Sequence, residues 1–153
     1  MINTGLSTFI NREVWRFLNL YKQTIFPSII SSSLYIIVFG HSLGSRIGKI
    51  KGIDYMDFII PGLVMMAVIN HAYQNSSSSI LQAKFLKFLD DILITPLSGF
   101  ELAIGYIIGG AFRGFLNGIV VFILSWLLTG FTINDLFTTF ILLFSVSWSF
   151  SAF

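Results

Sequence analysis

The chain consists of long apolar stretches separated by short polar segments, a pattern typical of a membrane protein with several spans. The apolar stretches cover residues 25–43, 58–73, 102–128 and 136–153. A helix needs about 20 residues to cross roughly 30 Å of hydrocarbon, so each stretch predicts one membrane-spanning helix. The third is longer than one crossing requires and is expected to tilt or to begin in the interfacial layer. The fourth is still apolar at Phe153, and we expect this span to be cut short.

Residues 1–22, ahead of the first apolar stretch, have the period of an amphipathic helix. Apolar residues recur three and four positions apart, and polar residues occupy the opposite side. The apolar positions are Leu6, Ile10, Val14, Phe17, Leu18 and Tyr21. Arg12 and Arg16 on the polar side, with Trp15 suited to the headgroup region, indicate a helix that lies along the membrane surface. An ordinary solvated first helix is the alternative interpretation.

A second amphipathic helix is predicted between the second and third spans, over residues 80–95. One stripe of it is apolar, and charged side chains occupy the rest of its surface: Lys84, Lys87, Asp90 and Asp91. Pro96 ends this helix, because proline disfavours helix at the preceding residue and cannot continue the hydrogen-bond ladder. The helix is either a docking element for a soluble partner or a loop helix that rests on lipid.

The placement of basic residues favours a cytoplasmic N-terminus. Three basic residues precede the first span and two lie between the second and third, against three between the first and second. Because cytoplasmic loops carry the excess of Lys and Arg, we expect residues 75–100 inside the cell and residues 40–55 and 129–135 outside.

Composition agrees with a membrane environment and excludes an ordinary soluble domain. Hydrophobic residues make up 55% of the chain and charged residues 10%, with a mean hydropathy of +0.85. Soluble domains carry roughly a quarter charged residues. The predicted fold class is therefore all-α, a polytopic membrane helical bundle that forms a single domain over residues 1–153.

No motif in the chain indicates catalysis. The sequence contains no Cys, which excludes disulfides, thiolate metal sites and a cysteine nucleophile. It also lacks a phosphate-binding G-x-x-x-x-G-K-[ST] run, an H-E-x-x-H zinc motif and a G-x-S-x-G nucleophile motif. We therefore expect no enzyme activity, metal or cofactor in this chain, and another subunit to supply any energy.

The third predicted span carries glycines at four-residue spacing, which lets membrane helices approach closely. They are Gly105 and Gly109, followed by Gly110, Gly114 and Gly118. Arg113 falls among them on a helical wheel, and a buried intramembrane arginine is a functional candidate. Glu101 lies about 18 Å away along a straight helix, so any counter-charge comes from another helix or chain. Snorkelling of Arg113 to an interface is the alternative.

These features together resemble the type-2 ABC exporter permeases, the family that includes drug-efflux, polysaccharide-export and Nod-factor-export subunits. The second span opens with Tyr55-Met-Asp-Phe-Ile-Ile-Pro-Gly-Leu. Asp90-Asp-Ile-Leu-Ile-Thr-Pro-Leu-Ser then leads through Glu101 to Gly109-Gly-Ala-Phe-Arg-Gly. The order and spacing of these blocks, across essentially the whole chain, carry the resemblance.

The resemblance implies a multi-pass permease of the bacterial inner membrane, with six spans, that dimerises and binds two separate ATPase subunits. Residues 84–93 would correspond to the coupling helix that docks on the ATPase, and residues 1–22 to the interfacial helix. ATP and Mg would bind to the partner, and the path would lie at the dimer interface. This chain shows four of the six spans, and we expect no nucleic acid partner.

Two questions stay open at the level of sequence. Members with similar motifs carry drugs, lipids or glycans, so the substrate is not defined. A carrier or an assembly scaffold that is not linked to ATP hydrolysis is the alternative function. An ion-coupled carrier should show ionisable residues deep in several spans, whereas Arg113 is nearly alone here. His71 beside Asn70 is better explained by a helix–helix hydrogen bond than by a proton relay.

Overall fold

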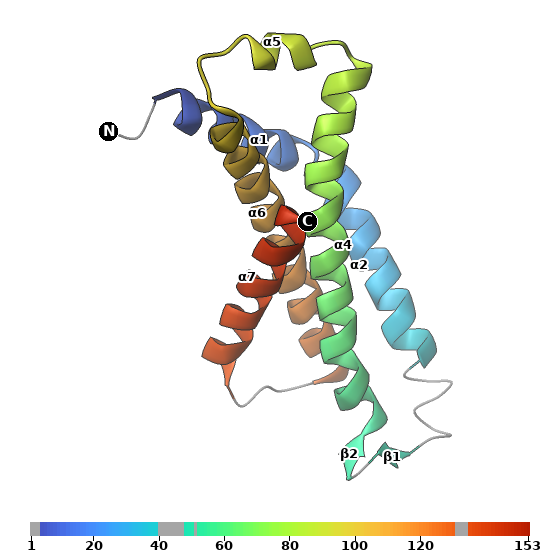
Figure 1. The fold of residues 1–153 in the computed structure, drawn as a ribbon. Coiled ribbons are helices and arrows are strands. Elements are labelled where there is room, and N and C mark those ends of the chain that lie inside the picture. The colour runs from blue at the N-terminus through green and yellow to red at the C-terminus, as the bar shows by residue number, and fades with distance from the viewer. Residues whose placement is uncertain (1–3, 40–47, 51, 131–134) are drawn as a thin grey trace.

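The computed structural model describes residues 4–39, 48–50, 52–130 and 135–153 of the chain. These residues form a bundle of α-helices with a small β-hairpin at one end (Figure 1). The helices are α1 (Thr4–Asn19), α2 (Tyr21–Val38), α4 (Tyr55–Phe85), α5 (Leu89–Leu93), α6 (Gly99–Thr129) and α7 (Leu136–Ala152). Strands β1 (Lys49–Ile50) and β2 (Ile53–Asp54) pair in antiparallel fashion. The all-α membrane bundle that the sequence predicts is confirmed.

Helices α4 and α6 form the centre of the bundle and pack along each other (Figure 1). Each has 31 residues. At 1.5 Å per residue this is about 46 Å, so both extend beyond a hydrocarbon layer of roughly 30 Å. Within the described ranges they are the two helices long and apolar enough to cross a membrane. α2 and α7 have 18 and 17 residues, and their crossing stays a prediction; residues 40–43 of the first predicted span lie outside the described residues.

The segment between the second and third predicted spans differs from the single helix expected over residues 80–95. α4 continues to Phe85, and only Leu89–Leu93 forms the separate helix α5. The break lies at Lys87, whose backbone has a left-handed φ of 58°. Across this turn the amide of Phe88 donates to the carbonyl of Ala83 at 3.1 Å, the long bond of a Schellman C-cap. Glycine usually occupies this position, so a lysine there gives no sequence signal that the helix ends.

α6 begins and ends at residues that suit helix termini. The amide of Glu101 donates to Ser98 Oγ at 3.2 Å, and the amide of Ser98 donates to Glu101 Oε2 at 2.8 Å. This reciprocal capping box satisfies two backbone donors of the first turn. Gly130, with φ of 67°, ends the helix in the left-handed conformation. The start of α6, close after α5, is thereby defined.

The glycines of α6 lie on two faces, and each face receives different neighbours. Gly105 and Gly109 lie against α1, whereas Gly110, Gly114 and Gly118 lie against α4 and α7. At Gly110 and at Gly114, a Cβ atom would come within 2.9 Å of a backbone carbonyl oxygen of α4. A backbone oxygen in a packed helix cannot move aside easily, so these contacts require glycine. They are contacts of helix packing.

An apolar core lies next to this glycine face. It is formed by buried residues of α4, α6 and α7, namely Ile60, Val64, Val68, Val121 and Leu143. The small glycine surface lets the branched side chains of α4 reach α6 without a gap, since Val68 also contacts Gly118.

Replacement of Gly114 by alanine should therefore weaken the bundle. We expect Gly114→Ala to lower the free energy of unfolding by about 1–3 kcal/mol, the usual cost of overpacking, measured by thermal unfolding of the full-length protein in detergent. The added Cβ would lie 2.9 Å from the carbonyl oxygen of Val68 and 2.7 Å from Ala72 Cβ. Gly62→Ala is the matched control, because a Cβ there meets nothing within 4 Å. Equal stability of the two variants would contradict the packing described.

Candidate functional site

A buried carboxylate lies where α1 crosses α4 and α6. Glu13 of α1 is 1% exposed. Its Oε1 pairs with Arg12 Nη2 at 2.9 Å, and its Oε2 pairs with Arg16 Nη2 at 3.1 Å. Ser79 Oγ of α4 donates to Glu13 Oε2 at 2.5 Å. Three donors thus satisfy a carboxyl side chain that would be costly to bury without partners.

Arg113 joins the same region from α6. It is half-buried, and its Nη1 lies 3.4 Å from Oδ1 of the buried Asn75 of α4. Arg16 Nη2 reaches the same oxygen, also at 3.4 Å, and Arg16 Nη1 donates to Gln82 Oε1 at 3.1 Å. The guanidinium of Arg113 also lies 5.9 Å from the ring centroid of Phe17. Arg113 therefore faces α1 and α4, and its nearest hydrogen-bond partner is a neutral amide.

Glu13, Asn75 and Ser79 were not predicted as site residues from the sequence. The predicted apolar stripe of α1 runs through Leu6 and Ile10, whereas the buried face runs through Phe9, Glu13 and Phe17. One signal was present: Glu13 is the only acidic residue of α1 and lies four positions from a Phe on either side. Trp15 and Arg12 are exposed, and the placement of α1 at a membrane surface stays a prediction.

The segment from the end of α4 to the start of α6 projects from one end of the bundle (Figure 1). The predicted docking residues Lys84, Lys87, Asp90, Asp91 and Pro96 are all exposed there. They are interspersed with large apolar side chains that are also exposed: Phe85 (76%), Leu86 (70%), Leu93 (62%) and Ile94 (81%). We call residues 84–96 the projecting segment. It combines charge with unpartnered apolar surface at the end of the bundle away from the hairpin.

The projecting segment is anchored to the bundle by the buried Ile92, together with the partly buried Phe88 and Leu89. Ile92 of α5 packs in a cluster with Phe9 of α1, Ala83 of α4 and Tyr106 of α6. The rings of Phe9 and Tyr106 meet edge to face at a centroid distance of 5.1 Å. A displacement of α5 would therefore be transmitted directly to three other helices.

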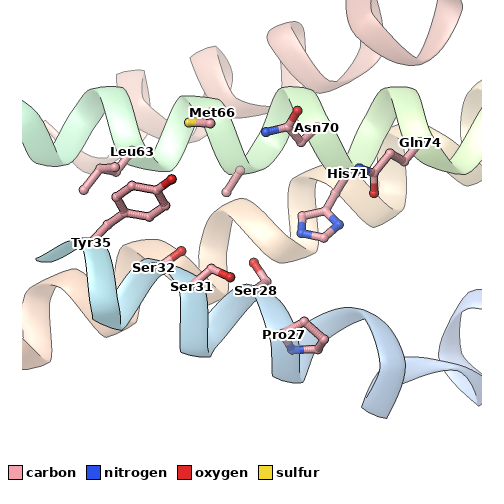
Figure 2. Close-up of a pocket in the computed structure, with 11 residues that line it drawn as sticks. Pro27, Ser28, Ser31, Ser32, Tyr35, Leu63, Met66, Asn70, His71 and Gln74 are labelled. Carbon is pink, nitrogen blue, oxygen red and sulfur yellow. The ribbon is translucent and has the colours of Figure 1, made fainter.

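A groove of about 320 Å³ lies between α2 and α4 (Figure 2). Its polar side chains are all uncharged or histidine: Ser28, Ser31, Ser32, Tyr35, Asn70, His71 and Gln74. Ser28 and Ser32 are buried residues, whereas Ser31 is exposed. His71 Nδ1 is buried without a partner among the described residues, in contrast to the helix–helix hydrogen bond expected for this side chain. The groove can therefore offer hydrogen bonds to water or to an uncharged polar group.

The structure brings together Arg16 and Arg113, which belong to two separate predicted helices, at the same oxygen of Asn75. Within the described ranges, no three His, Cys, Asp or Glu side chains converge where they could hold a metal ion.

Removal of the Glu13 carboxylate should destabilise the protein strongly. We expect Glu13→Ala to cost about 3 kcal/mol of unfolding free energy, because two arginines lose a buried partner. Thermal unfolding of the full-length protein would measure this, with Asp90→Ala as the control at an exposed carboxylate. A Glu13→Ala protein as stable as the control would show that the cluster contributes little.

The chain is similar to one protein family and to several known proteins. The ABC-2 type transporter family matches residues 4–153. The inner membrane transport permease YadH of Escherichia coli strain K12 is 39% identical over 131 residues, which cover 86% of this chain and 51% of the relative. YadH proteins of Escherichia coli O157:H7 and Shigella flexneri match to the same extent. The chain spans about half the length of these relatives. No solved structure matches.

The family match covers all of the described residues, including the buried Glu13 cluster, the projecting segment and the glycine faces of α6. The resemblance inferred from the sequence is therefore confirmed at the level of the family. The chain belongs to the ABC-2 type transporter family of membrane proteins.

Proposed function

We propose that this chain is the permease part of an ATP-driven exporter in the bacterial inner membrane, with its N-terminus in the cytoplasm. A second copy would complete the translocation path, and a separate ATPase subunit, which binds ATP and Mg, would drive transport. Family membership and the relatives' description as inner membrane transport permeases support a transport role. The projecting segment is the observation that carries the coupling to an ATPase.

The surface of the projecting segment fits a protein partner. Exposed Phe85 and Ile94 would be desolvated in a cleft, which is how apolar anchors contribute to binding. Charges at Lys87 and Asp91 lie beside them and can define the orientation of the partner.

The anchoring of Ile92 supplies the mechanical link. Because Ile92 packs against Phe9, Ala83 and Tyr106, movement of a docked ATPase would push on α1, α4 and α6 together. Packed side chains transmit displacement over such short distances since protein interiors are close-packed. The projecting segment therefore acts as the coupling element of the proposed exporter.

The translocation path is assigned to the groove between α2 and α4 rather than to the glycines. Gly110 and Gly114 are closed off by α4 and α7, which supports a packing role for them. The groove, by contrast, is lined by several polar side chains and contains His71, whose buried Nδ1 has no hydrogen-bond partner among the described residues. Unsatisfied polar groups are costly in hydrocarbon, so such a surface fits a water-filled path.

Docking is tested by a substitution on the projecting segment. We expect Ile94→Asp to reduce copurification of the ATPase subunit with the full-length protein by about tenfold or more, because a charge replaces an apolar anchor. Quantitative mass spectrometry after affinity purification from native membranes measures the ratio. Ile53→Asp, at an exposed isoleucine of the hairpin, is the matched control and should not change it.

Charge reversal at Lys87 or Asp91 should also weaken docking while membrane insertion is retained. Undiminished copurification in all of these variants would remove the projecting segment from the coupling role. Reproducible absence of any ATPase with the unaltered protein would instead favour a carrier or an assembly scaffold.

The path assignment is tested by cysteine accessibility, which is convenient because this chain has no cysteine. In the full-length protein, with cysteines outside this chain replaced, Ser31→Cys should react with a small hydrophilic methanethiosulfonate reagent at least about tenfold faster than Phe26→Cys, since thiolate forms in water and not in lipid. Phe26 is an exposed α2 residue outside the groove. Similar slow labelling of both positions would show that the groove holds no water.

A further inference from the structure

We propose that the cavity where α1, α2, α4 and α6 meet binds a phosphate-type anion, which the headgroup of an anionic phospholipid can supply. The cavity is separate from the α2–α4 groove and has a volume of about 190 Å³. Its most polar lining residues are Arg16, Arg113, Gln23, Asn75 and Gln82, and no Asp or Glu lines it. This inference requires that the chain lies in a membrane, and it does not depend on the proposed coupling to an ATPase.

Charge around the cavity is unbalanced. Glu13 is the carboxylate of this region, and it is already paired with Arg12 and Arg16. Arg113 has no carboxylate within ion-pair distance among the described residues, and its hydrogen bond goes to the neutral Asn75. Arg16 and Arg113 both line the cavity, and the one nearby carboxylate, Glu13, is shared with Arg12 outside it, so positive charge is in excess in a partly buried place. Such an excess is costly without a counter-ion.

Hydrogen-bond acceptors are also in short supply. Arg16 and Arg113 both point at the same oxygen, Asn75 Oδ1, at 3.4 Å each, which brings two cations together. Gln82 Oε1 already accepts from Arg16, and Glu13 accepts from Ser79 as well as from its arginines. The Nε atoms of both arginines and Asn75 Nδ2 are buried with no acceptor among the described residues.

An anion with several oxygens would supply both the missing negative charge and the missing hydrogen-bond acceptors. Arginine forks match the geometry of phosphate oxygens, and amide side chains such as Gln23 can add further donors. Asn75 is 1% exposed, so the site is built into the bundle and is not a surface accident. A neutral hydroxylated ligand would leave the positive charge uncompensated.

The position of the cavity favours a lipid headgroup as the source. It lies at the corner where α1 ends and α2 begins, and Phe17 and Leu20 form the apolar part of its wall. A phospholipid places its phosphate at the same boundary between polar and apolar surroundings, and basic pockets on the cytoplasmic side of membrane helices bind such groups. The predicted cytoplasmic N-terminus puts this corner in the inner leaflet.

The test uses the full-length protein in phosphatidylcholine nanodiscs, with and without phosphatidylglycerol, and measures the thermal midpoint and lipid retention by native mass spectrometry. We expect phosphatidylglycerol to raise the midpoint and to be retained. Arg16→Gln and Arg113→Gln should each reduce the retention of phosphatidylglycerol about tenfold and reduce the rise in the midpoint, since each substitution removes one cationic fork. Arg12→Gln is the control: it also removes one positive charge from α1, but outside the cavity, and should keep most of the phosphatidylglycerol retention and of the midpoint rise.

Gln23→Glu keeps the proposal testable if the arginine variants do not fold. A carboxylate built into the cavity should supply the counter-charge, raise the midpoint in pure phosphatidylcholine and abolish the response to phosphatidylglycerol. A parallel titration with inorganic phosphate separates the sources: a matching rise with phosphate alone supports a site for a free anion. No response of the unaltered protein to either anion, or equal losses in Arg12→Gln and Arg16→Gln, would overturn the proposal.

Discussion

The bundle depends on the close approach of α6 to α4 at Gly110 and Gly114. Lipid is as apolar as the side chains it surrounds, so helices in a membrane gain little from simply avoiding solvent and associate through close packing. The carbonyl oxygens of Ala72 and Val68 lie where any side chain on α6 would have to go. This contact holds the two long helices together and thereby fixes where every other element can pack.

Small hydroxyl side chains of α7 also pack closely against α6. Ser147 and Ser151 of α7 donate to the carbonyls of Ala111 and Ile107 of α6 at 2.6 and 2.7 Å. These serines are short enough to fit beside the glycine face, and their hydrogen bonds are directional. α4, α6 and α7 therefore form one tightly packed unit. α1 and α5 attach to it through side chains, in the apolar cluster around Ile92 and the polar cluster around Glu13.

Sequence patterns were sufficient for features that depend on neighbours along the chain. Apolar blocks of the right length located α4 and α6, and the four-residue glycine spacing indicated close helix contacts. The patterns failed where the outcome depends on distant residues. Burial of Glu13 depends on Ser79, 66 positions away. A helical wheel cannot show which side of α1 meets the bundle when both sides carry apolar residues. The break at Lys87 was missed for a local reason, because the left-handed position lacks the usual glycine.

The two clusters on α1 have different mechanical properties, and this bears on how a docked partner would act. Phe9 belongs to the Ile92 cluster and packs there through apolar surface, whose dispersion contacts are non-directional. One turn later, a directional hydrogen bond from Ser79 joins Glu13 to α4, and Arg16 of the next turn donates to Gln82 of the same helix. In the proposed transport cycle, a push on α5 would therefore shift the Phe9 end of α1 more easily than the Glu13 position. α1 would pivot at Glu13, and its far end, beside Arg16 and the start of α2, would move in the opposite sense.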